Sequence, residues 1–472
     1  MRPEDLPALR QAIADLWDLA RAQGLDPLPT HFEIVPAPIL YEIAAYGLPG
    51  RFSHWSHGKA YQSMKGQYDL GLVKYFELVI NGDPAQAFLL DANDLLTDKF
   101  VVAHVLGHSD FFRHNAHFTT TARDMPARVA LHAGRLRTYE FDHGREEVEA
   151  FLEALLAIED HVDPWAGFAE PGGGGPDAGL IRGLPREKRT LPPHAAATGV
   201  AAGAAGPRDF SILFPTARAA PAKKPDLPPE KQECSDLLLF LLRHAPQLED
   251  WQRDTIAIVR EEALYFRPQL RTKIMNEGWA TFWHTRLLRE LGLTDAEYTD
   301  FARLNAQVRT PQPGGVNPYL LGVAIYEDTL ERLGEAEGLR QCFLMREVLD
   351  DVGFLRNHLT REVVERLDMF VYGEQREGGQ SLWKITAKDF EKVRETLIQS
   401  RGHGGRPVIE AVDGDGGGAR ELVLAHLHDG RDLDLVAAQK TLERVARIWG
   451  RRCRLQTSVA GKPKELVVEA GR

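Results

Sequence analysis

The 472-residue chain has few cysteines, and none of them lie close together in the sequence. Cys234, Cys342 and Cys453 are odd in number, and no Cys-x-x-Cys pair occurs. A disulfide framework and a structural zinc site built from cysteines are therefore both disfavoured. The pattern predicts buried, unreactive thiols in a reducing compartment.

The sequence also has no segment that resembles a membrane-targeting signal. The first residues include Glu4 and Asp5, and the apolar stretch of a signal peptide is missing. No apolar run reaches the length of a membrane span, about 20 residues. We therefore expect a cytoplasmic protein.

An excess of positive charge is missing as well. The formal net charge is −11 at pH 7, which argues against bulk nucleic-acid binding and gives no general attraction to anionic lipid. The signatures GxSxG, the P-loop and GxGxxG at a strand–helix junction do not occur either. Any chemistry must therefore be sought in clusters of side chains.

Hydrophobic periodicity divides the chain into four parts. Residues 1–166 and 232–375 show mostly helical spacing and predict two parts of one helical core domain. Residues 167–231 are dominated by Gly, Pro and Ala, which predicts a flexible insertion. Residues 380–472 predict a small α+β C-terminal domain. The predicted fold class is mainly α with a small β-hairpin or sheet, compatible with a zincin-like helical core.

Several elements can be placed within these parts. Two β-rich runs in residues 75–91 flank the turn signal Asn-Gly-Asp-Pro and predict a hairpin. A helix is expected over 95–113, and a second over 248–266, with a new helix starting at Pro268. In the C-terminal part, His426 and His428 alternate along a predicted strand and are assigned to the surface.

The helix over 95–113 carries the strongest chemical signal. His104 and His108 are four residues apart, so they stack on one helical face and could share one metal ion, as in HExxH zincins. This helix is apolar almost all round, which predicts burial. Buried imidazoles need hydrogen-bond partners or a metal ion.

A second polar interruption lies in the segment IMNEGWATFWH. Glu277 stands in the middle of an otherwise core-like helical stripe, where a carboxylate is unfavourable unless it is paired, hydrogen-bonded or bound to a metal. Gly278 permits a close backbone approach at this point. If the two helices face each other, His104, His108 and Glu277 form the two-histidine, one-carboxylate set of catalytic zinc sites.

Three interpretations of this set remain open: a metal site, a buried polar network, or placements that are unrelated. A hydrolytic mechanism also needs a general base, because Val105 occupies the position of the HExxH glutamate. Glu262, His284 and Asp110 are candidates for that base.

The segment RFSHWSHGKAY offers further candidates. His54 is a candidate acid, base or extra ligand, and Trp55 and Lys59 are candidates for substrate contact. The alternative is a loop packed by Trp55 with solvated histidines, which we favour for His57. Asn115 continues the stripe of the paired histidines and is a third candidate for substrate contact.

A family resemblance covers nearly the whole chain. It rests on long segments that occur in order: GLPGRFSHWSHGKAY, YFELVING with AFLLDAND, AHVLGHSDFF, DWQRDTIAIVREEALYF, KIMNEGWATFWH, GVNPYLLG, FLRNHLT, HLHDGRDLD and LERVARIWGR. These resemble the SpoVR family, named for stage V sporulation protein R. The stretch 167–231 is longer than that family leads us to expect.

The resemblance implies a process rather than a reaction. In spore formers the family is linked to the peptidoglycan cortex of the spore. In other bacteria it is often encoded beside a PrkA-type serine protein kinase and a von Willebrand-type domain protein, and is tied to stress or nutrient adaptation. Two hypotheses follow: a zinc-dependent hydrolase or amide-bond enzyme that distantly resembles gluzincins, or a non-catalytic regulatory or scaffold protein that acts with those two partners.

Overall fold

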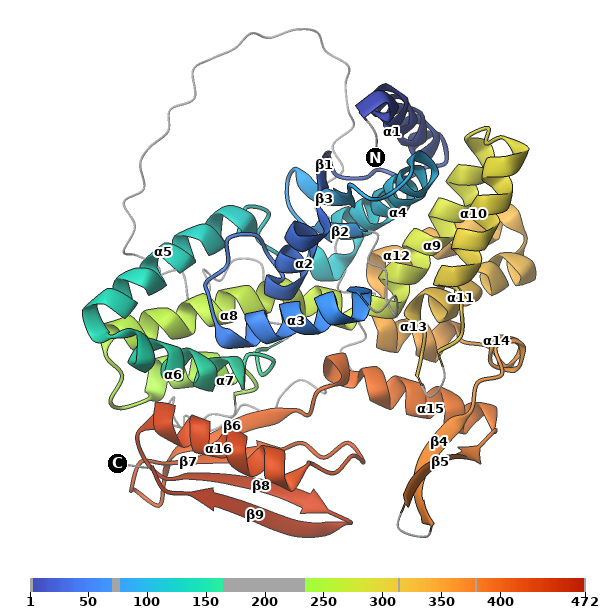
Figure 1. Cartoon of the computed structure of the whole chain (residues 1–472). Helices are drawn as coiled ribbons and strands as arrows, with labels where there is room; N and C mark the ends of the chain where they lie inside the picture. Colours follow the sequence, from blue (N-terminus) through green and yellow to red (C-terminus); the bar gives the residue numbers. More distant parts are fainter. Residues whose placement is uncertain (1–2, 70–76, 164–233, 313–314, 378–379, 471–472) are drawn as a thin grey trace, which may run out of the picture. The chain divides into compact units, whose positions relative to one another are not determined.

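The computed structural model describes residues 3–69, 77–163, 234–312, 315–377 and 380–470 (Figure 1). The predicted flexible insertion, residues 167–231, lies outside the described residues. The rest is mainly helical with small sheets, as the sequence predicts. Within the described ranges, no helix combines the length and the apolar character that a membrane crossing requires.

A three-stranded sheet lies near the N-terminus, in the order β1-β3-β2. The antiparallel pair β2 and β3 confirms the predicted hairpin, with Leu78 opposite Phe88. Strand β1 adds to it in parallel, which local patterning did not predict. The elements of this region are α1 (Leu6–Ala22), β1 (Thr30–Val35), α2 (Ala37–Tyr46), α3 (Trp55–Asp69), β2 (Glu77–Ile80) and β3 (Ala85–Leu90).

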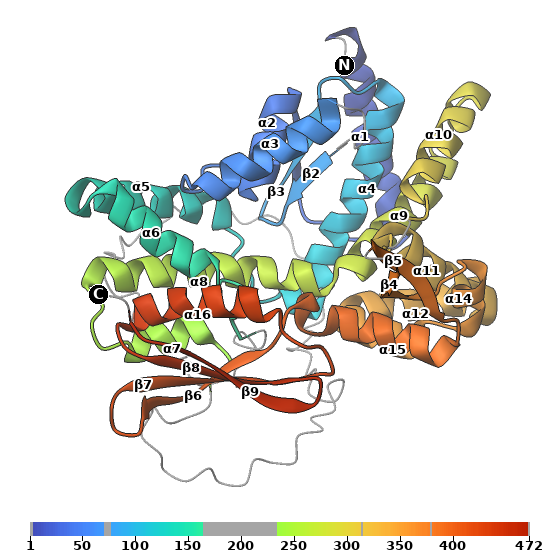
Figure 2. The same ribbon diagram turned by 60° about the horizontal axis from the view of Figure 1, so that its bottom comes forward.

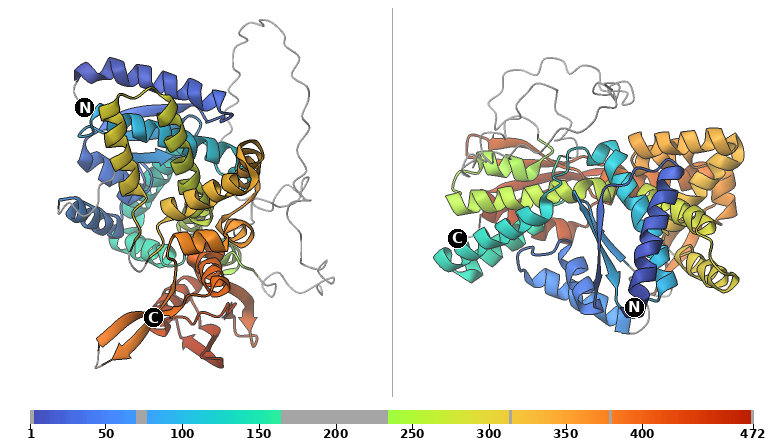
Figure 3. Two further views of the ribbon diagram at one scale, coloured as in Figure 1. Left: turned by 90° about the vertical axis from the view of Figure 1, so that its right-hand side faces the viewer. Right: turned by 90° about the horizontal axis from the view of Figure 1, so that it is seen from above.

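Three helices form the centre of the fold: α4 (Leu95–His114), α9 (Lys273–Glu290) and α11 (Pro318–Leu333). Helix α9 packs against both of the others, and α1 packs against α4 (Figure 3). Glycines set these crossings. A Cβ on Gly107 of α4 would lie 2.7 Å from the Cα of Ala280, and a Cβ on Gly278 would lie 2.5 Å from the backbone of Gly322. Backbones this close leave little freedom in how the side chains beside the glycines face each other.

Further helices surround this centre and share one hydrophobic core with it. They are α10 (Asp295–Val308), α12 (Glu335–Val348), α13 (Asp351–His358), α14 (Arg361–Arg366) and α15 (Phe390–Arg401). Helix α15 packs against α13 and contributes Phe390 and Val393 to this core. A hairpin of β4 (Val371–Glu377) and β5 (Gln380–Ala387) precedes α15, so the chain leaves the mostly helical spacing expected for residues 232–375 at Val371.

A second hydrophobic core joins four helices to the C-terminal sheet. The helices are α5 (Met125–His143), α6 (Arg145–Leu156), α7 (Leu237–His244) and α8 (Asp250–Arg271). The sheet has the order β6-β7-β8-β9, and α16 covers one of its faces (Figure 2). Its elements are β6 (Ile409–Gly416), β7 (Glu421–His426), α16 (Leu435–Trp449), β8 (Cys453–Val459) and β9 (Lys462–Val468). Short 3₁₀ turns span Pro3–Asp5, Ala116–Phe118 and Gly402–Gly405.

One predicted helix boundary is wrong. Pro268 does not start a new helix but lies in the last turn of α8, and the break falls at Thr272. The carbonyl of Pro268 accepts hydrogen bonds from the Thr272 amide at 3.1 Å and from the Thr272 hydroxyl at 2.8 Å. The chain then turns directly into α9, so the position of Glu277 along α9 is set from this junction.

Candidate metal centre

Helix α4 presents two imidazoles, one turn apart, inside the core. Its first turn is capped by Asp94, whose carboxylate accepts a hydrogen bond from the Thr97 amide at 2.7 Å. Every residue from Leu96 to Phe112 except Lys99 is buried, which agrees with the predicted apolar circumference. The rings of His104 and His108 lie edge to face with centroids 4.6 Å apart. The i,i+4 spacing therefore produces the shared face that it predicts.

Helix α9 brings Glu277 to the same point. Its Oε2 lies 3.6 Å from Nε2 of His104 and 3.3 Å from Nε2 of His108. One ligand atom from each of the three residues can be chosen so that all lie within 4.8 Å of one another. Two ligands of a tetrahedral zinc ion, each about 2.0–2.2 Å from the metal, are themselves about 3.3–3.6 Å apart. The separations from Glu277 therefore suit a single small ion.

The far side of each imidazole is occupied by another polar side chain. Nδ1 of His108 lies 2.8 Å from Oδ1 of Asn276, and Nδ1 of His104 lies 2.8 Å from Nδ1 of His284. Because an amide oxygen only accepts, a neutral His108 must carry its proton on Nδ1 and its lone pair on Nε2. Such partners fix the tautomer and ring orientation of metal-binding histidines.

His284 fixes the tautomer of His104 in a similar way. Its Nε2 lies 3.1 Å from Oδ1 of Asn305, so it donates there and keeps a lone pair on Nδ1 to accept from Nδ1–H of His104. Burial, reinforced by the neighbouring His104, holds the pKa of His284 well below its usual range. Neutral His284 therefore leaves the lone pair of His104 on Nε2, toward Glu277. With both nitrogens engaged, His284 is placed to orient His104 rather than to reach a substrate.

The carboxylate of Glu277 is buried and charged. Burial alone would raise its pKa, but Lys273, together with the two imidazoles when they carry a proton on Nε2, outweighs that effect and holds the pKa well below the usual value. Oε1 accepts a hydrogen bond from Nζ of Lys273 at 2.7 Å. Oε2 is also buried and accepts no hydrogen bond of ordinary geometry from the described residues. Electron-pair donors that converge in this way are stable when a cation or a proton lies between them.

Four residues around this cluster were not predicted: Asn276, Asn305, Lys273 and Tyr319. Lys273 and Glu277 are an i,i+4 pair, so this contact has a sequence signal. Asn276 directly precedes Glu277, but its contact with His108 spans 168 positions. Tyr319, from the GGVNPYLLG segment, stacks on His104 with ring centroids 5.9 Å apart. No local pattern reveals such contacts between distant helices.

Glu262, a candidate base, lies in an ion-pair cluster of its own on α8. Its Oε2 accepts from Nε of Arg51 at 2.5 Å, and its Oε1 lies 3.1 Å from Nδ1 of His132. Asp110 is likewise engaged, with Trp279 at 2.9 Å and Arg346 at 3.0 Å. Both carboxylates have structural partners.

The remaining candidates lie on other elements. Trp55 starts helix α3, so the predicted loop is in fact helical from this residue, and Trp55 is 52% exposed rather than packed. His54 and His57 are buried, which corrects the expected solvated histidines. Nδ1 of His54 lies 2.7 Å from the Ser56 hydroxyl, and Lys59 is exposed.

Asn115 ends α4 instead of continuing its polar stripe. Its amide nitrogen donates to the carbonyls of Arg346 and Leu349 at 2.7 and 2.9 Å, and its oxygen accepts from the His117 amide at 3.0 Å. The side chain is thus committed to backbone groups. In the described part of the chain, His104, His108 and Glu277 form the one group of three histidine, cysteine or acidic residues close enough to hold a metal ion.

The fold and the cluster define a mainly helical protein with a buried His₂Glu centre and an appended α+β module. A family model described as SpoVR like protein matches residues 4–406, and one described as SpoVR-like C-terminal domain matches residues 407–460. The chain therefore belongs to the SpoVR family, which confirms the resemblance drawn from its motifs.

A relative from Escherichia coli (strain K12), described as uncharacterized protein YcgB, is 27% identical over 486 residues. The similarity covers 93% of this chain and 89% of that protein. No solved structure matches the chain. The family name links the chain to sporulation, and it names no reaction.

Proposed function

We propose that the chain binds one divalent metal ion, zinc, through Nε2 of His104, Nε2 of His108 and Oε2 of Glu277. The observation that carries this proposal is the convergence of three electron-pair donors, with Nδ1 of each imidazole occupied by another side chain. Two histidines and one carboxylate are the ligand set of catalytic zinc sites that keep an open position.

The function we propose for this centre is a metal-dependent hydrolase or another enzyme that acts at an amide bond. Zinc in such a site polarises a carbonyl or lowers the pKa of a bound water. Neighbouring residues position the proposed ligands: Lys273 donates a hydrogen bond to Oε1 of Glu277, while Asn276 and His284 orient the imidazoles. A peptide or a peptidoglycan precursor is the substrate class suggested by the process tied to the family.

A second candidate is favoured by Val105. This residue is fully buried and apolar at the position where HExxH enzymes carry their general base. Glu262 and Asp110, the other carboxylates considered for that task, are held by Arg51 and Arg346. The alternative is a non-catalytic regulatory or scaffold protein that acts with a PrkA-type serine kinase and a von Willebrand-type domain protein, with zinc stabilising its core.

Metal analysis of the purified full-length chain tests the proposed centre. We expect one zinc ion per chain in the wild type and in His114→Ala, and a loss of zinc in His104→Ala. His114 is a matched control because it lies on the same helix and is 27% exposed. A folded wild type that stays free of metal after incubation with zinc contradicts the proposal.

The two candidate functions differ in what the zinc-loaded protein does. The enzyme hypothesis predicts release of new amino groups from a peptide or peptidoglycan-precursor panel, abolished in Glu277→Gln. The scaffold hypothesis predicts no release, together with co-purification of the chain with the kinase whether or not zinc is bound. Turnover that survives removal of zinc contradicts both assignments of the centre.

A further inference from the structure

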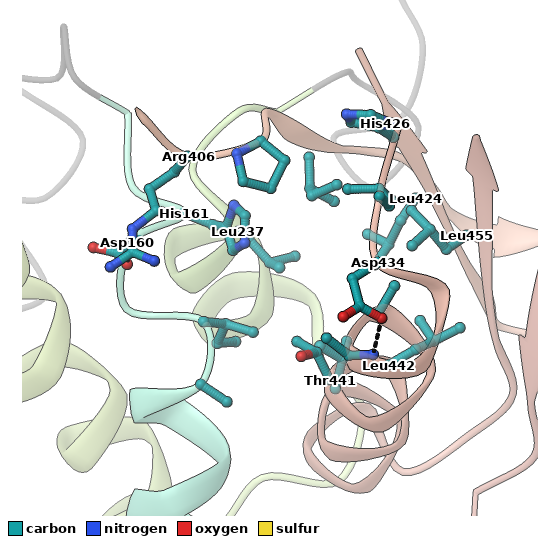
Figure 4. Close-up of a pocket in the computed structure, with 18 of the residues that line it drawn as sticks. Asp160, His161, Leu237, Arg406, Leu424, His426, Asp434, Thr441, Leu442 and Leu455 are labelled. Atoms are coloured by element: carbon teal, nitrogen blue, oxygen red, sulfur yellow. Dashed lines mark hydrogen bonds and ion pairs between the residues drawn. The ribbon is translucent and has the colours of Figure 1, made fainter. Parts of the chain in front are cut away.

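A cavity of about 460 Å³ lies between the helical part of the chain and the C-terminal sheet. Its lining comes from the segment after α6, from α7, and from β6, β7, α16 and β8 (Figure 4). It shares no lining residue with the His104, His108 and Glu277 cluster. The volume falls within the range of small-molecule sites, about 300–1,000 Å³, and such sites favour the boundaries between domains.

The walls of this cavity are apolar side chains that are already packed in the second core. Leu237 of α7 faces Leu424, Leu442 and Leu455 across the space (Figure 4). All four are buried members of that core cluster, with exposures of 1–5%. A wall fixed by its own packing keeps the space open for an apolar body of a ligand without rearrangement.

The charged groups of the lining carry a surplus of negative charge. Four aspartates and two arginines line the cavity, which gives a formal charge of −2. Arg406 pairs with Asp160 at 2.9 Å, and Arg431 pairs with Asp429 at 2.5 Å. Asp432 and Asp434 are the carboxylates in excess of the arginines. Oδ1 of Asp432 lies 2.8 Å from Nε2 of His428, and its Oδ2 accepts a hydrogen bond from the Ala460 amide at 3.0 Å. Asp434 caps the N-terminus of α16, where it accepts hydrogen bonds from backbone amides.

The two histidines of the lining do not offset this charge at neutral pH. Burial lowers the pKa of His161 to about 4. Burial also lowers the pKa of His426, whose Nδ1 lies 2.9 Å from the Thr457 hydroxyl. His426 is 8% exposed, so its assignment to the surface from the sequence is wrong. Both rings are neutral at pH 7 and offer hydrogen bonds rather than charge.

We propose that this cavity is a binding site for a small organic cation, with an apolar body that carries one protonated amine. The apolar body fits between Leu237 and the leucines of the sheet and α16, and the amine fits the rim where the carboxylates outnumber the guanidinium groups. This proposal does not rest on the metal centre. Because the site joins the helical part to the C-terminal module, occupation stabilises that junction.

Tryptamine and indole-3-propionate test the proposal on the full-length chain, since they share a ring and differ in the sign of their charge. Ligand-observed NMR and calorimetric titration measure binding to the wild type, Ala438→Phe and Lys440→Phe. Ala438 lines the cavity from α16, whereas Lys440 lies on the same helix, exposed and outside the lining. Thr441→Trp is a second filling variant, used if circular dichroism shows that Ala438→Phe is unfolded.

We expect saturable binding of tryptamine that is at least about ten-fold tighter than that of indole-3-propionate, an energy difference of about 1.4 kcal/mol. The filling variant loses this binding and Lys440→Phe retains it. Asp432→Asn, at an exposed carboxylate, weakens tryptamine binding about three-fold. Equal or stronger binding of indole-3-propionate overturns the proposal, as does unchanged binding in the filling variant or no binding of tryptamine at all.

Discussion

Two buried glutamates on successive helices, Glu262 of α8 and Glu277 of α9, face histidines in different ways. Both carboxylate oxygens of Glu262 have a partner: Nε of Arg51 at 2.5 Å and Nδ1 of His132 at 3.1 Å. In Glu277, Oε1 accepts a hydrogen bond from Lys273, whereas Oε2 faces the Nε2 atoms of His104 and His108. The first site is an ion pair, and the second has the arrangement that we propose as a set of metal ligands.

This difference shows what a buried carboxylate in a sequence does and does not reveal. Each glutamate must have a partner, because an isolated buried charge is strongly unfavourable. The kind of partner depends on which helices meet it. A guanidinium completes the charge of Glu262, so that cluster needs nothing more. The Glu277 cluster is completed only by a cation or a proton between its three donors.

The largest expected effect is a loss of folding stability when Glu262, but not its neighbour Glu261, is neutralised. Glu262→Gln leaves the guanidinium of Arg51, whose side chain is 9% exposed, without its closest carboxylate. We expect a loss of about 3 kcal/mol in the free energy of unfolding, measured by urea denaturation, with zinc affinity unchanged. The neighbouring Glu261→Gln is the control and should lose less than about 1 kcal/mol, because Glu261 is 30% exposed. A fall in zinc affinity in Glu262→Gln would break the distinction between the sites.

The second effect tests whether the close crossing of α9 and α11 determines the geometry of the proposed metal site. Gly278→Ala places a Cβ 2.5 Å from the Gly322 backbone, directly beside Glu277. We expect a loss of about 1–3 kcal/mol in stability, together with weaker zinc binding, because the helices must move apart. Gly58→Ala in α3 has open space around it and serves as the control. Zinc affinity that stays at the wild-type value in Gly278→Ala contradicts this view.

The third effect concerns the side chain that orients His108. Asn276→Ala removes the acceptor for Nδ1–H, and we expect a loss of about 10–100-fold in zinc affinity, measured by competition with a chelator. Asn276→Asp restores an acceptor oxygen and should recover most of the affinity. If the alanine and aspartate variants bind zinc equally well, Asn276 does not orient the ligand.

The smallest effect is a pH dependence that belongs to the Glu262 cluster. Burial lowers the pKa of His132, but its hydrogen bonds to Glu261 and Glu262 outweigh burial and raise the pKa above 6.5. His132 therefore stabilises the fold fully below pH 6.5, and this contribution is lost as the pH rises through the raised pKa. Relative to His132→Asn, the wild type should lose about 1 kcal/mol or less between pH 6 and pH 9 in urea denaturation. Parallel stability–pH curves for the two proteins contradict this assignment.

Local patterns were enough to find the ligands of the proposed centre. The i,i+4 spacing of His104 and His108 and the interrupted stripe at Glu277 both report on the faces of single helices. The hairpin of β2 and β3 was found for the same reason, because its turn and its strands are consecutive. Burial of polar groups in apolar helices then required that they meet partners.

Local patterns could not predict which residues these buried polar groups contact. Arg51 and Glu262 are 211 positions apart, and His104 and His284 are 180 apart, so their contacts follow from tertiary packing. Strand β1 pairs in parallel with β3, although α2, α3 and β2 lie between these two strands in the sequence. His426 alternates like a surface residue, yet it is buried and lines the cavity beside the sheet, which no periodicity within its own strand shows.

Zinc stoichiometry in three matched proteins tests the central claim most directly. Equilibrium dialysis of the wild type, Glu277→Gln and Glu262→Gln against zinc should give one ion per chain in the wild type and in Glu262→Gln, and none in Glu277→Gln. Both variants remove one buried carboxylate charge, so only the geometry of the two clusters distinguishes them. A wild type without zinc, or equal zinc in all three proteins, would contradict the metal centre.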